Sequence, residues 1–256
     1  MLEHALITGA SSGLGVLFAR ELAASGWPLV LVARRGERLE ALATELRLKH
    51  KVEVHPMPSD LTAPGAVKEI TDELARRNIH MGTLINNAGA GLHGRFADLP
   101  LESELQIMDL NMRAMVELTH RVLPPMRAAK LGDVLNVASM AAFQPGPKMA
   151  IYYATKAFVL SFSEGLHEEL KGEGVHVTAL CPAPMDTEII DIAKIRNSLL
   201  FRILRSPAQP AVQAGLRGLN RNQAVVVPGA KNRLVAGSMR FLPPNWPRKI
   251  AHMLQG

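Results

Sequence analysis

The sequence predicts an α/β protein in which about seven parallel strands form one sheet with helices on both faces. Three observations support this prediction. Short apolar runs alternate along the chain with longer stretches of helical periodicity. The first apolar run leads into a glycine-rich turn and then a helix. A later run is followed by a helical segment in which Tyr152 and Lys156 stand four residues apart, on one face.

The composition is that of one α/β domain with a sizeable core. The chain has 256 residues, of which 48% are hydrophobic. Its single cysteine, Cys181, excludes an internal disulfide, fits a reducing compartment and reads as a buried thiol at a strand end. Met1 leads almost directly into a strand without a basic leader segment, and no apolar run has the ~18–20 residues of a membrane span. We therefore expect a cytoplasmic protein with no transmembrane segment.

Positive charge is concentrated in the C-terminal part of the chain. The formal net charge is +6, and eleven lysines and arginines follow the last acidic residue, Asp191. This region could attract an acidic substrate, an acidic carrier protein or the lipid head groups of a membrane, or it could be a solvated face. Nucleic-acid binding is not expected, because aromatic residues make up only 4% of the chain and no recognition motif is present.

The first strand, expected over 2–8, ends in a turn that suits a pyrophosphate. A helix is expected from Gly13 to Ser25, and its N-terminus offers free N–H groups and a partial positive charge. Glycines in the turn would let the backbone approach the phosphates, although an ordinary tight turn would use them too. The residues expected around the pyrophosphate are Gly9, Ser11, Ser12, Gly13, Leu14 and Gly15.

The second strand, expected over 28–33, ends in Arg34 and Arg35. In a dinucleotide-binding fold this position meets the adenosine ribose, where an acidic residue would hold the 2′-hydroxyl of NAD. Arginine suits the 2′-phosphate of NADP instead. The alternative is a pair of solvated charges at a strand end.

Further cofactor contacts are expected after the third and fourth strands, placed over 52–57 and 83–86. Asp60, followed by Leu61, could accept a hydrogen bond from the adenine amino group, cap the helix that begins near Pro64, or do both. Asn87 could tie neighbouring strands together. The small residues Ala88 and Gly89 would leave room for the cofactor.

The second half of the chain continues the alternation. Helices are expected over 37–49, 64–78, 99–126, 150–171 and 210–219, and strands over 134–138, 175–180 and 224–227. The segment 186–204 reads as a partly helical substrate flap, because it follows the carboxyl end of a strand, where α/β sheets bind ligands. Residues 1–228 would form the dinucleotide-binding and catalytic domain. Residues 229–256 would form a basic, apolar tail packed on that domain or on a partner subunit.

Ser139, Tyr152 and Lys156 are the candidate catalytic residues. Ser139 ends a strand, and Tyr152 lies on the next helix, so a hydroxyl and a phenol could meet there. Together they could bind a carbonyl oxygen and deliver a proton to it. A nearby lysine cation would favour the phenolate and bring the phenol closer to its working pH range.

These motifs, in this order, strongly resemble those of the short-chain dehydrogenase/reductase family, whose members have a single Rossmann-type, doubly wound domain. The resemblance covers about residues 2–228. Residues 8–15 match the TGxxxGxG turn of the family, residues 86–89 match its NNAG segment, and Arg34 lies where NADP-preferring members bind the 2′-phosphate. The residues that fall on the catalytic tetrad are Asn111, Ser139, Tyr152 and Lys156.

The resemblance also implies roles for other residues. Pro182, Met185 and Thr187 match positions beside the nicotinamide, whereas Ala183 replaces the usual glycine and makes the local backbone path less certain. Asn111 would hold a water that joins Lys156 to solvent. Family members commonly form homodimers or homotetramers by packing the two long helices around Asn111 and Phe158.

The resemblance implies an NADP(H)-dependent oxidoreductase that transfers hydride between nicotinamide and a carbonyl or secondary alcohol, without a metal. The substrate is expected to be apolar because the flap is rich in isoleucine and leucine. Tyr152 would be the general acid/base, and the adjacent Tyr153 would pack or line an interface. The alternative is a catalytically silent NADP-binding sensor or scaffold protein of the same fold, which the intact tetrad disfavours.

Overall fold

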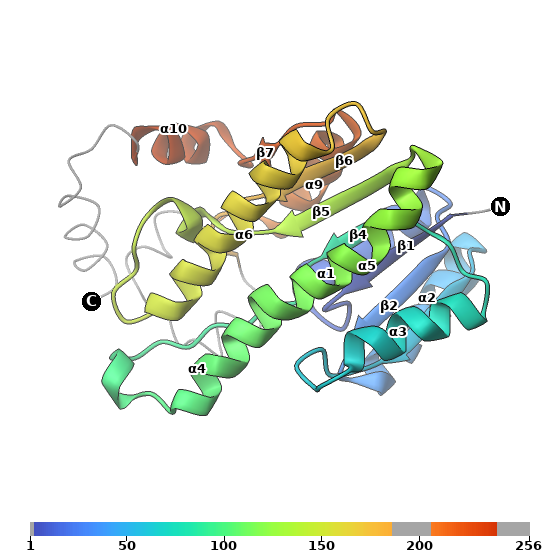
Figure 1. Ribbon diagram of the computed structural model, residues 1–256, viewed down its shortest axis with the longest axis horizontal. Helices are drawn as coiled ribbons and strands as arrows, with labels where there is room; N and C mark the ends of the chain where they lie inside the picture. The colour runs from blue at the N-terminus through green and yellow to red at the C-terminus, as the bar shows by residue number, and fades with distance from the viewer. Residues whose placement is uncertain (1–2, 186–205, 240–256) are drawn as a thin grey trace.

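Seven parallel strands form one sheet in the computed structural model of the chain (Figure 1). The structure describes residues 3–185 and 206–239. The strand order is β3-β2-β1-β4-β5-β6-β7. Both the seven-stranded sheet and the doubly wound α/β class predicted from the sequence are confirmed. The strands are β1 (His4–Thr8), β2 (Leu29–Ala33), β3 (Val54–Pro58), β4 (Met81–Asn86), β5 (Gly132–Val137), β6 (Val175–Leu180) and β7 (Val225–Val226).

Helices cover both faces of the sheet because alternate strand residues point to opposite sides. On β1, Ile7 belongs to the core cluster formed with α1 (Gly13–Ala24), α2 (Gly36–His50) and α9 (Ala208–Asn220). Leu6, its neighbour, belongs to the cluster formed with α3 (Ala66–Arg76) and α5 (Ala114–Ala129). α6 (Ala150–Glu169) runs beside α5 in Figure 1 and packs Val159 against the carboxyl half of β6.

The strand order reverses between β1 and β4. The chain moves from β1 outward to β2 and β3, then returns to place β4 on the other side of β1. The connections that leave the carboxyl ends of β1 and β4 therefore run to opposite sides, and a crevice opens between them. This reversal decides where a ligand can bind.

The helix expected over 99–126 is a chain of three segments. They are α4 (Leu101–Met108), a π-helical turn, η2 (Asp109–Arg113), and α5. The turn η2, whose hydrogen bonds span one residue more than those of an α-helix, contains Asn111. The buried side chain of Asn111 bonds to a neighbouring loop. Such turns occur frequently at functional sites. Short 3₁₀ turns occur at Phe96–Asp98 (η1) and Met140–Phe143 (η3).

The beginning of the C-terminal segment is helical. The helix α10 (Ala230–Met239) places Ala236 in a small apolar cluster with Met140 and Ala183. The remainder of the expected tail, 240–256, and the expected flap, 186–204, lie outside the described residues. Within the described ranges, no helix has the length and apolar character required to cross a bilayer.

A row of buried polar side chains crosses the carboxyl half of the sheet. The amide of Asn86 donates to Asn136 Oδ1 at 2.8 Å and to Thr119 Oγ1 at 3.0 Å. Asn136 in turn donates to Ser163 Oγ at 2.9 Å. Asn136 is fully buried, so each of these groups depends on its neighbours for hydrogen bonds.

We predict that Asn136→Ala lowers the free energy of unfolding by about 2–3 kcal/mol, because it removes two buried hydrogen bonds, one from the Asn86 amide and one to Ser163 Oγ, and leaves a small cavity. Urea denaturation monitored by circular dichroism measures this change. Ser25→Ala, at the exposed end of α1, is the control and should change stability by less than about 0.5 kcal/mol. Equal stability of the two variants would contradict the network.

Candidate active site

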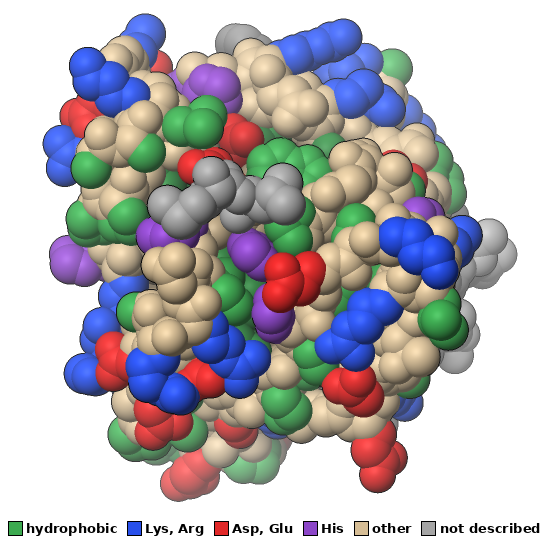
Figure 2. Space-filling model, turned by 90° about the vertical axis from the view of Figure 1, so that its right-hand side faces the viewer, with side chains coloured by type: hydrophobic (Ala, Val, Ile, Leu, Met, Phe, Trp, Pro, Cys, Tyr) green, Lys and Arg blue, Asp and Glu red, His purple; other side chains and the backbone are tan. Residues whose placement is uncertain are grey.

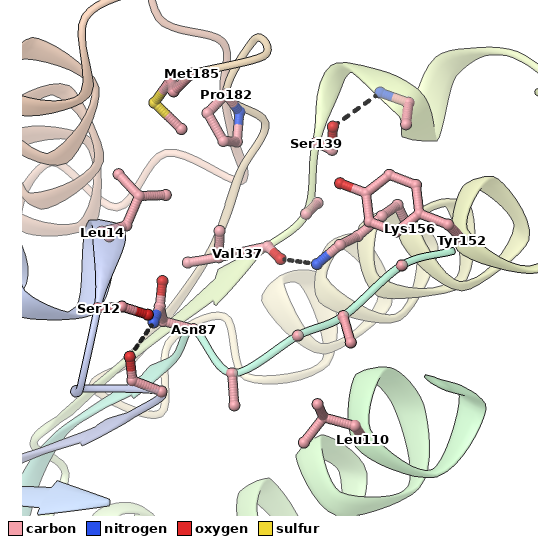
Figure 3. Close-up of a pocket in the computed structure, with 18 of the residues that line it drawn as sticks. Ser12, Leu14, Asn87, Leu110, Val137, Ser139, Tyr152, Lys156, Pro182 and Met185 are labelled. Carbon is pink, nitrogen blue, oxygen red and sulfur yellow. Dashed lines mark hydrogen bonds between the residues drawn. The ribbon is translucent and has the colours of Figure 1, made fainter. Parts of the chain in front are cut away.

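A cavity of about 360 Å³ lies at the carboxyl edge of the sheet, at the reversal of strand order. It runs from the glycine-rich turn after β1, past the segment after β4, to η3 and α6 (Figure 3). The predicted site residues that line it are Gly9, Ser11, Ser12, Gly13, Leu14, Arg34, Arg35, Asp60, Leu61, Asn87, Ala88, Gly89, Ser139, Tyr152, Lys156, Pro182 and Met185.

Hydrogen bonds between Thr8 and Asn87 hold two walls of the cavity together. Thr8 Oγ1 accepts the backbone N–H groups of Asn87 and Ala88, both at 3.0 Å. The Asn87 amide donates to the backbone oxygens of Thr8 at 2.9 Å and Gly9 at 3.3 Å. Asn87 therefore ties neighbouring strands together, as the sequence suggested, and the threonine hydroxyl completes the link.

The glycines of the turn are needed for close packing. Gly9 and Gly13 have φ of +67° and +53°, in the left-handed region. A Cβ at Gly15 would lie 2.2 Å from the carbonyl oxygen of Gly9, so α1 could not pack against the turn. Gly15, predicted to contact the cofactor, does not line the cavity; it permits this packing.

The N-terminus of α1 is directed at the cavity and suits an anion. Ser12 is its N-cap residue, but the serine side chain makes no capping hydrogen bond, and no acidic residue occupies the first turn. The free N–H groups and the positive end of the helix are therefore available to a phosphate. These are the properties a pyrophosphate group requires.

Two arginines and an aspartate stand beside this end of the cavity. Arg35 Nε and Nη2 donate to Ser11 Oγ at 3.2 and 3.1 Å. Asp60 Oδ1 accepts from Thr62 N–H at 3.0 Å and Thr62 Oγ1 at 2.8 Å, forming an Asx turn. Burial opposes the lowering of the Asp60 pKa, but the bonds from Thr62 and the Arg34 charge hold it below its usual value.

Asp60 does not cap the following helix. The helix α3 begins at Ala66, and its N-cap position is Gly65, with φ +79°. The expected capping role is wrong because the loop Leu61–Gly65 places the helix start beyond the reach of the carboxylate.

Asn111 positions the segment that faces Lys156. Its Oδ1 accepts the backbone N–H of Ala90, and its Nδ2 donates to the carbonyl of Ala90 and to Thr155 Oγ1, all at 2.9 Å. A Cβ at Gly89 would lie 3.2 Å from Asn111 Oδ1 and 3.4 Å from Lys156 Nζ. Asn111 is buried behind the cavity wall rather than lining the cavity.

Ser139 and Tyr152 point into the cavity from opposite elements (Figure 3). Ser139 caps η3, and its Oγ accepts the N–H of Ala141 at 3.1 Å. The phenol ring packs on Gly91, where a Cβ would lie 2.8 Å from Tyr152 Cδ2. Burial raises the pKa of Tyr152, and the hydrogen bond with Ser139 acts in the opposite direction.

Lys156 is buried beside the phenol. Its Nζ donates to the carbonyl of Val137 at 2.8 Å and lies 5.9 Å from the centroid of the Tyr152 ring. Burial lowers the pKa of Lys156 to about 8, with a smaller opposing effect of Cys181. The expectation that Lys156 lowers the pKa of Tyr152 is not met in this geometry, because burial of the phenol dominates.

Comparisons with known proteins identify the family of this chain. A family model described as short chain dehydrogenase matches residues 3–195, three quarters of the chain. The chain belongs to the short-chain dehydrogenase/reductase family. Sulfoacetaldehyde reductase 2 of Chromohalobacter salexigens is 40% identical over 190 residues, covering 73% of this chain and 75% of that protein.

Two further relatives extend the comparison. Very-long-chain 3-oxoacyl-CoA reductase of Bos taurus is 35% identical over 196 residues, covering 75% of this chain and 62% of its own length. A solved short-chain dehydrogenase from Sphingobium yanoikuyae in complex with NADPH is 36% identical, covers 94% of each chain and has a TM-score of 0.84. Both the family and its doubly wound fold are thereby established for this chain.

Ala183, which departs from the family pattern, and Tyr153, which was expected to pack, are both accommodated in the structure. Ala183 is buried against Met140 and Ala236, and it is not among the described non-glycine residues with positive φ, so alanine causes no strain there. Tyr153 is buried and packs against Ala141 and Met149, with its ring tilted at 75° to Tyr152. Thr187, the remaining predicted contact, lies outside the described residues.

Several residues of this family site were not predicted individually. Thr8 and Thr155 act through their hydroxyls on Asn87 and Asn111, and a threonine in sequence carries no sign of a partner 44 or 79 residues away. Gln144 lines the cavity, and its Oε1 is buried without a hydrogen-bond partner among the described residues.

Cys181 is buried with a pKa raised to about 12 by burial, as expected of a structural thiol.

We predict that the buried cation of Lys156 makes stability increase with pH. Its folded-state pKa of about 8 lies below the ordinary 10.5, so the unfolded chain binds more protons between these values. The free energy of unfolding of the native protein, relative to Lys156→Met, should therefore rise by about 2 kcal/mol from pH 8 to pH 10.

Urea denaturation of both proteins at each pH measures this difference. Groups such as Cys181 are present in both proteins, so their titration largely cancels. Parallel pH profiles for the native protein and Lys156→Met would show that the ammonium is not buried in this way.

Proposed function

We propose that the protein is an NADP(H)-dependent oxidoreductase that reduces a carbonyl group or oxidises the corresponding secondary alcohol. One observation carries the proposal. A phenol, a hydroxyl and an ammonium group meet in one cavity with a helix N-terminus and two arginines suited to phosphates. Family membership and the NADPH complex of a solved relative support the same assignment.

The residues along the cavity would hold the cofactor in a definite order. The turn Gly9–Leu14 and the start of α1 would bind the pyrophosphate. Arg34, with Arg35 held by Ser11, would bind the 2′-phosphate of NADP. Asp60 and Leu61 would border the adenine, and Asn87–Gly89 the ribose nearer the nicotinamide. Pro182 and Met185, with Thr187, would border the nicotinamide.

The remaining residues would handle the oxygen of the substrate. Once bound, the reduced cofactor supplies a hydride to the carbonyl carbon. Ser139 Oγ would donate a hydrogen bond to the carbonyl oxygen as negative charge develops there. Tyr152 would transfer its phenolic proton to that oxygen, and in the reverse direction its phenolate would accept the alcohol proton.

Lys156 would assist Tyr152 through charge and position. With a pKa of about 8, its amine is largely protonated near pH 7. A cation beside the ring would favour the phenolate and so oppose the effect of burial, which raises the pKa of Tyr152. The ammonium would also bind the nicotinamide ribose. Asn111 would act as a positioning residue, because it holds Ala90 and Thr155 in place around this lysine.

The substrate end of the cavity is predominantly apolar. Its wall beyond Tyr152 contains Met140, Ala141, Met149 and Tyr153, with the amide of Gln144 as a polar exception. An apolar ketone or alcohol therefore fits better than a charged one. The very-long-chain 3-oxoacyl-CoA reductase relative is named for a substrate that carries a very long acyl chain.

We also propose that the protein forms a homo-oligomer through α5 and α6. Together with η2, the two helices carry a groove lined by Met112, Val116, His120 and Phe158 among others. Phe158 is 38% exposed and stacks on Phe162 with an interplanar angle of 8°. An apolar face of this kind suits the helix pairing that is common in this family.

We predict that NADPH stabilises the protein more than NADH does. A ligand that binds only the folded state adds about 2.7 kcal/mol at one hundred times its dissociation constant. The midpoint of thermal unfolding should therefore rise clearly with NADPH and little with NADH at equal concentration.

The variant Arg34→Ala should reduce the rise with NADPH and leave that with NADH unchanged. Arg77→Ala, an exposed arginine at the end of α3 paired with Glu73, is the matched control and should retain the full difference. Equal shifts with both cofactors would remove the NADP preference. No shift with either would contradict the oxidoreductase proposal.

We predict that the two adjacent phenols differ in function. Tyr152→Phe should lower kcat for carbonyl reduction by at least about 10²-fold, because the proton donor is lost. Tyr153→Phe should retain most of the turnover, because that ring contributes packing. A panel of apolar ketones with NADPH measures both variants. A Tyr152→Phe enzyme with nearly native turnover would contradict the assignment, and cofactor binding without turnover by the native protein would indicate a sensor.

A further inference from the structure

A second group of chemically active side chains lies at the opposite edge of the sheet, where the strands begin. Figure 2 looks onto this edge, and histidine and acidic side chains lie next to one another near its centre. His4, Glu53 and His55 offer one ligand atom each, and these three atoms lie within 4.8 Å of one another. The catalytic chemistry proposed above uses none of them.

Strand order and alternation explain why these residues meet. In the sheet register, Ala5 pairs with Leu29 and Leu29 pairs with Val54. Ala5 and Val54 both point into the core beneath α1 and α2. Their neighbours His4, Glu53 and His55 therefore point to the other face of the sheet, from strands that flank β2.

The distances are close to those of a coordination shell. Glu53 Oε1 lies 2.9 Å from His55 Nε2, and Glu53 Oε2 lies 3.7 Å from His4 Nε2. Ligand atoms in a tetrahedral zinc site, with bonds of about 2.0–2.1 Å, are about 3.3 Å apart. Small side-chain rotations are therefore sufficient to bring all three atoms onto one ion.

The three side chains differ in burial: the two histidines are mostly buried, and the glutamate is exposed. The side chains of His4 and His55 are 9% and 18% exposed, so packing restricts both rings, whose centroids are 5.5 Å apart. The Glu53 side chain is 64% exposed, so solvent reaches the group at this carboxylate. An ion could enter past the carboxylate, and water could complete its coordination.

We propose that His4, Glu53 and His55 form a binding site for a zinc-like divalent transition metal ion that bridges β1 and β3 across β2. Two imidazole nitrogens and one carboxylate oxygen suit Zn²⁺, whereas Mg²⁺ and Ca²⁺ prefer sites made of oxygen alone. The site lies about 13 Å from the cofactor cavity, at the other end of the five-residue strand β1. Its role would be to fix the beginning of the sheet.

The test uses the full-length protein without a polyhistidine tag, treated with a chelator and then titrated with ZnCl₂. Isothermal titration calorimetry should show one strong site per chain, with micromolar or tighter affinity. At one hundred times the dissociation constant, the thermal unfolding midpoint should rise by about 5–11 °C. MgCl₂ at the same concentration should produce no comparable shift.

His55→Ala and Glu53→Ala should each weaken Zn²⁺ binding by at least about 100-fold, because even residues that only support a ligand contribute 10–100-fold. His176→Gln is the matched control. His176 lies at the same edge of the sheet, 3.1 Å from the carboxylate of Asp133, but it is not in the three-ligand group. This variant should retain the strong site.

Three results would overturn the proposal. One is the absence of stoichiometric Zn²⁺ binding by the native protein. Another is retention of the strong site in both His55→Ala and Glu53→Ala, when circular dichroism shows that the variants are folded. Loss of the site in His176→Gln as well would show that binding is a general property of this edge, and it would equally contradict the three-residue assignment.

Discussion

The exchange of hydrogen bonds between Thr8 and Asn87 is the constraint on which the rest of the site depends. It joins the carboxyl ends of β1 and β4 at the point where strand order reverses, and there the connecting segments would otherwise separate. One hydroxyl accepts two part-buried backbone N–H groups, those of Asn87 and Ala88. The glycine-rich turn can then pack closely enough to direct α1 at the cavity.

Close packing links this contact to α6, the helix that carries Tyr152 and Lys156. The segment after Asn87 passes Lys156 at Gly89 and the ring of Tyr152 at Gly91, and a side chain at Gly91 would collide with that ring. Asn111 holds the intervening Ala90 from the other side. One chain segment, 88–91, therefore lines the cavity and contacts both the Tyr152 ring and the Lys156 ammonium. Burial of Tyr152 and Lys156 is unfavourable for their charged forms, so it raises the pKa of the phenol and lowers that of the ammonium.

The departures from prediction share a physical origin. Helical periodicity over 99–126 was correct, but the π-helical turn surrounds Asn111, whose partners Ala90 and Thr155 lie 21 and 44 residues away. Asp60 was correctly placed at the cavity, yet its capping role was wrong because Thr62 and the position of Gly65 decide it. Tyr152 was expected beside a lysine, but the balance between burial and that charge depends on depth and distance, which a sequence does not contain.

By itself, the sequence determined the α/β class, the number of strands and many of the residues that line the cavity. The class and the strands follow from hydrophobic period, and the site residues follow from the glycine turn, the residues four apart on a helix and the resemblance of these motifs to a family. Only the tertiary structure decided which polar groups satisfy one another, where the π-helical turn falls and which face His4 shares with Glu53 and His55. Those outcomes depend on strand order and register, because residues that are between 21 and 79 positions apart become neighbours only when the sheet assembles.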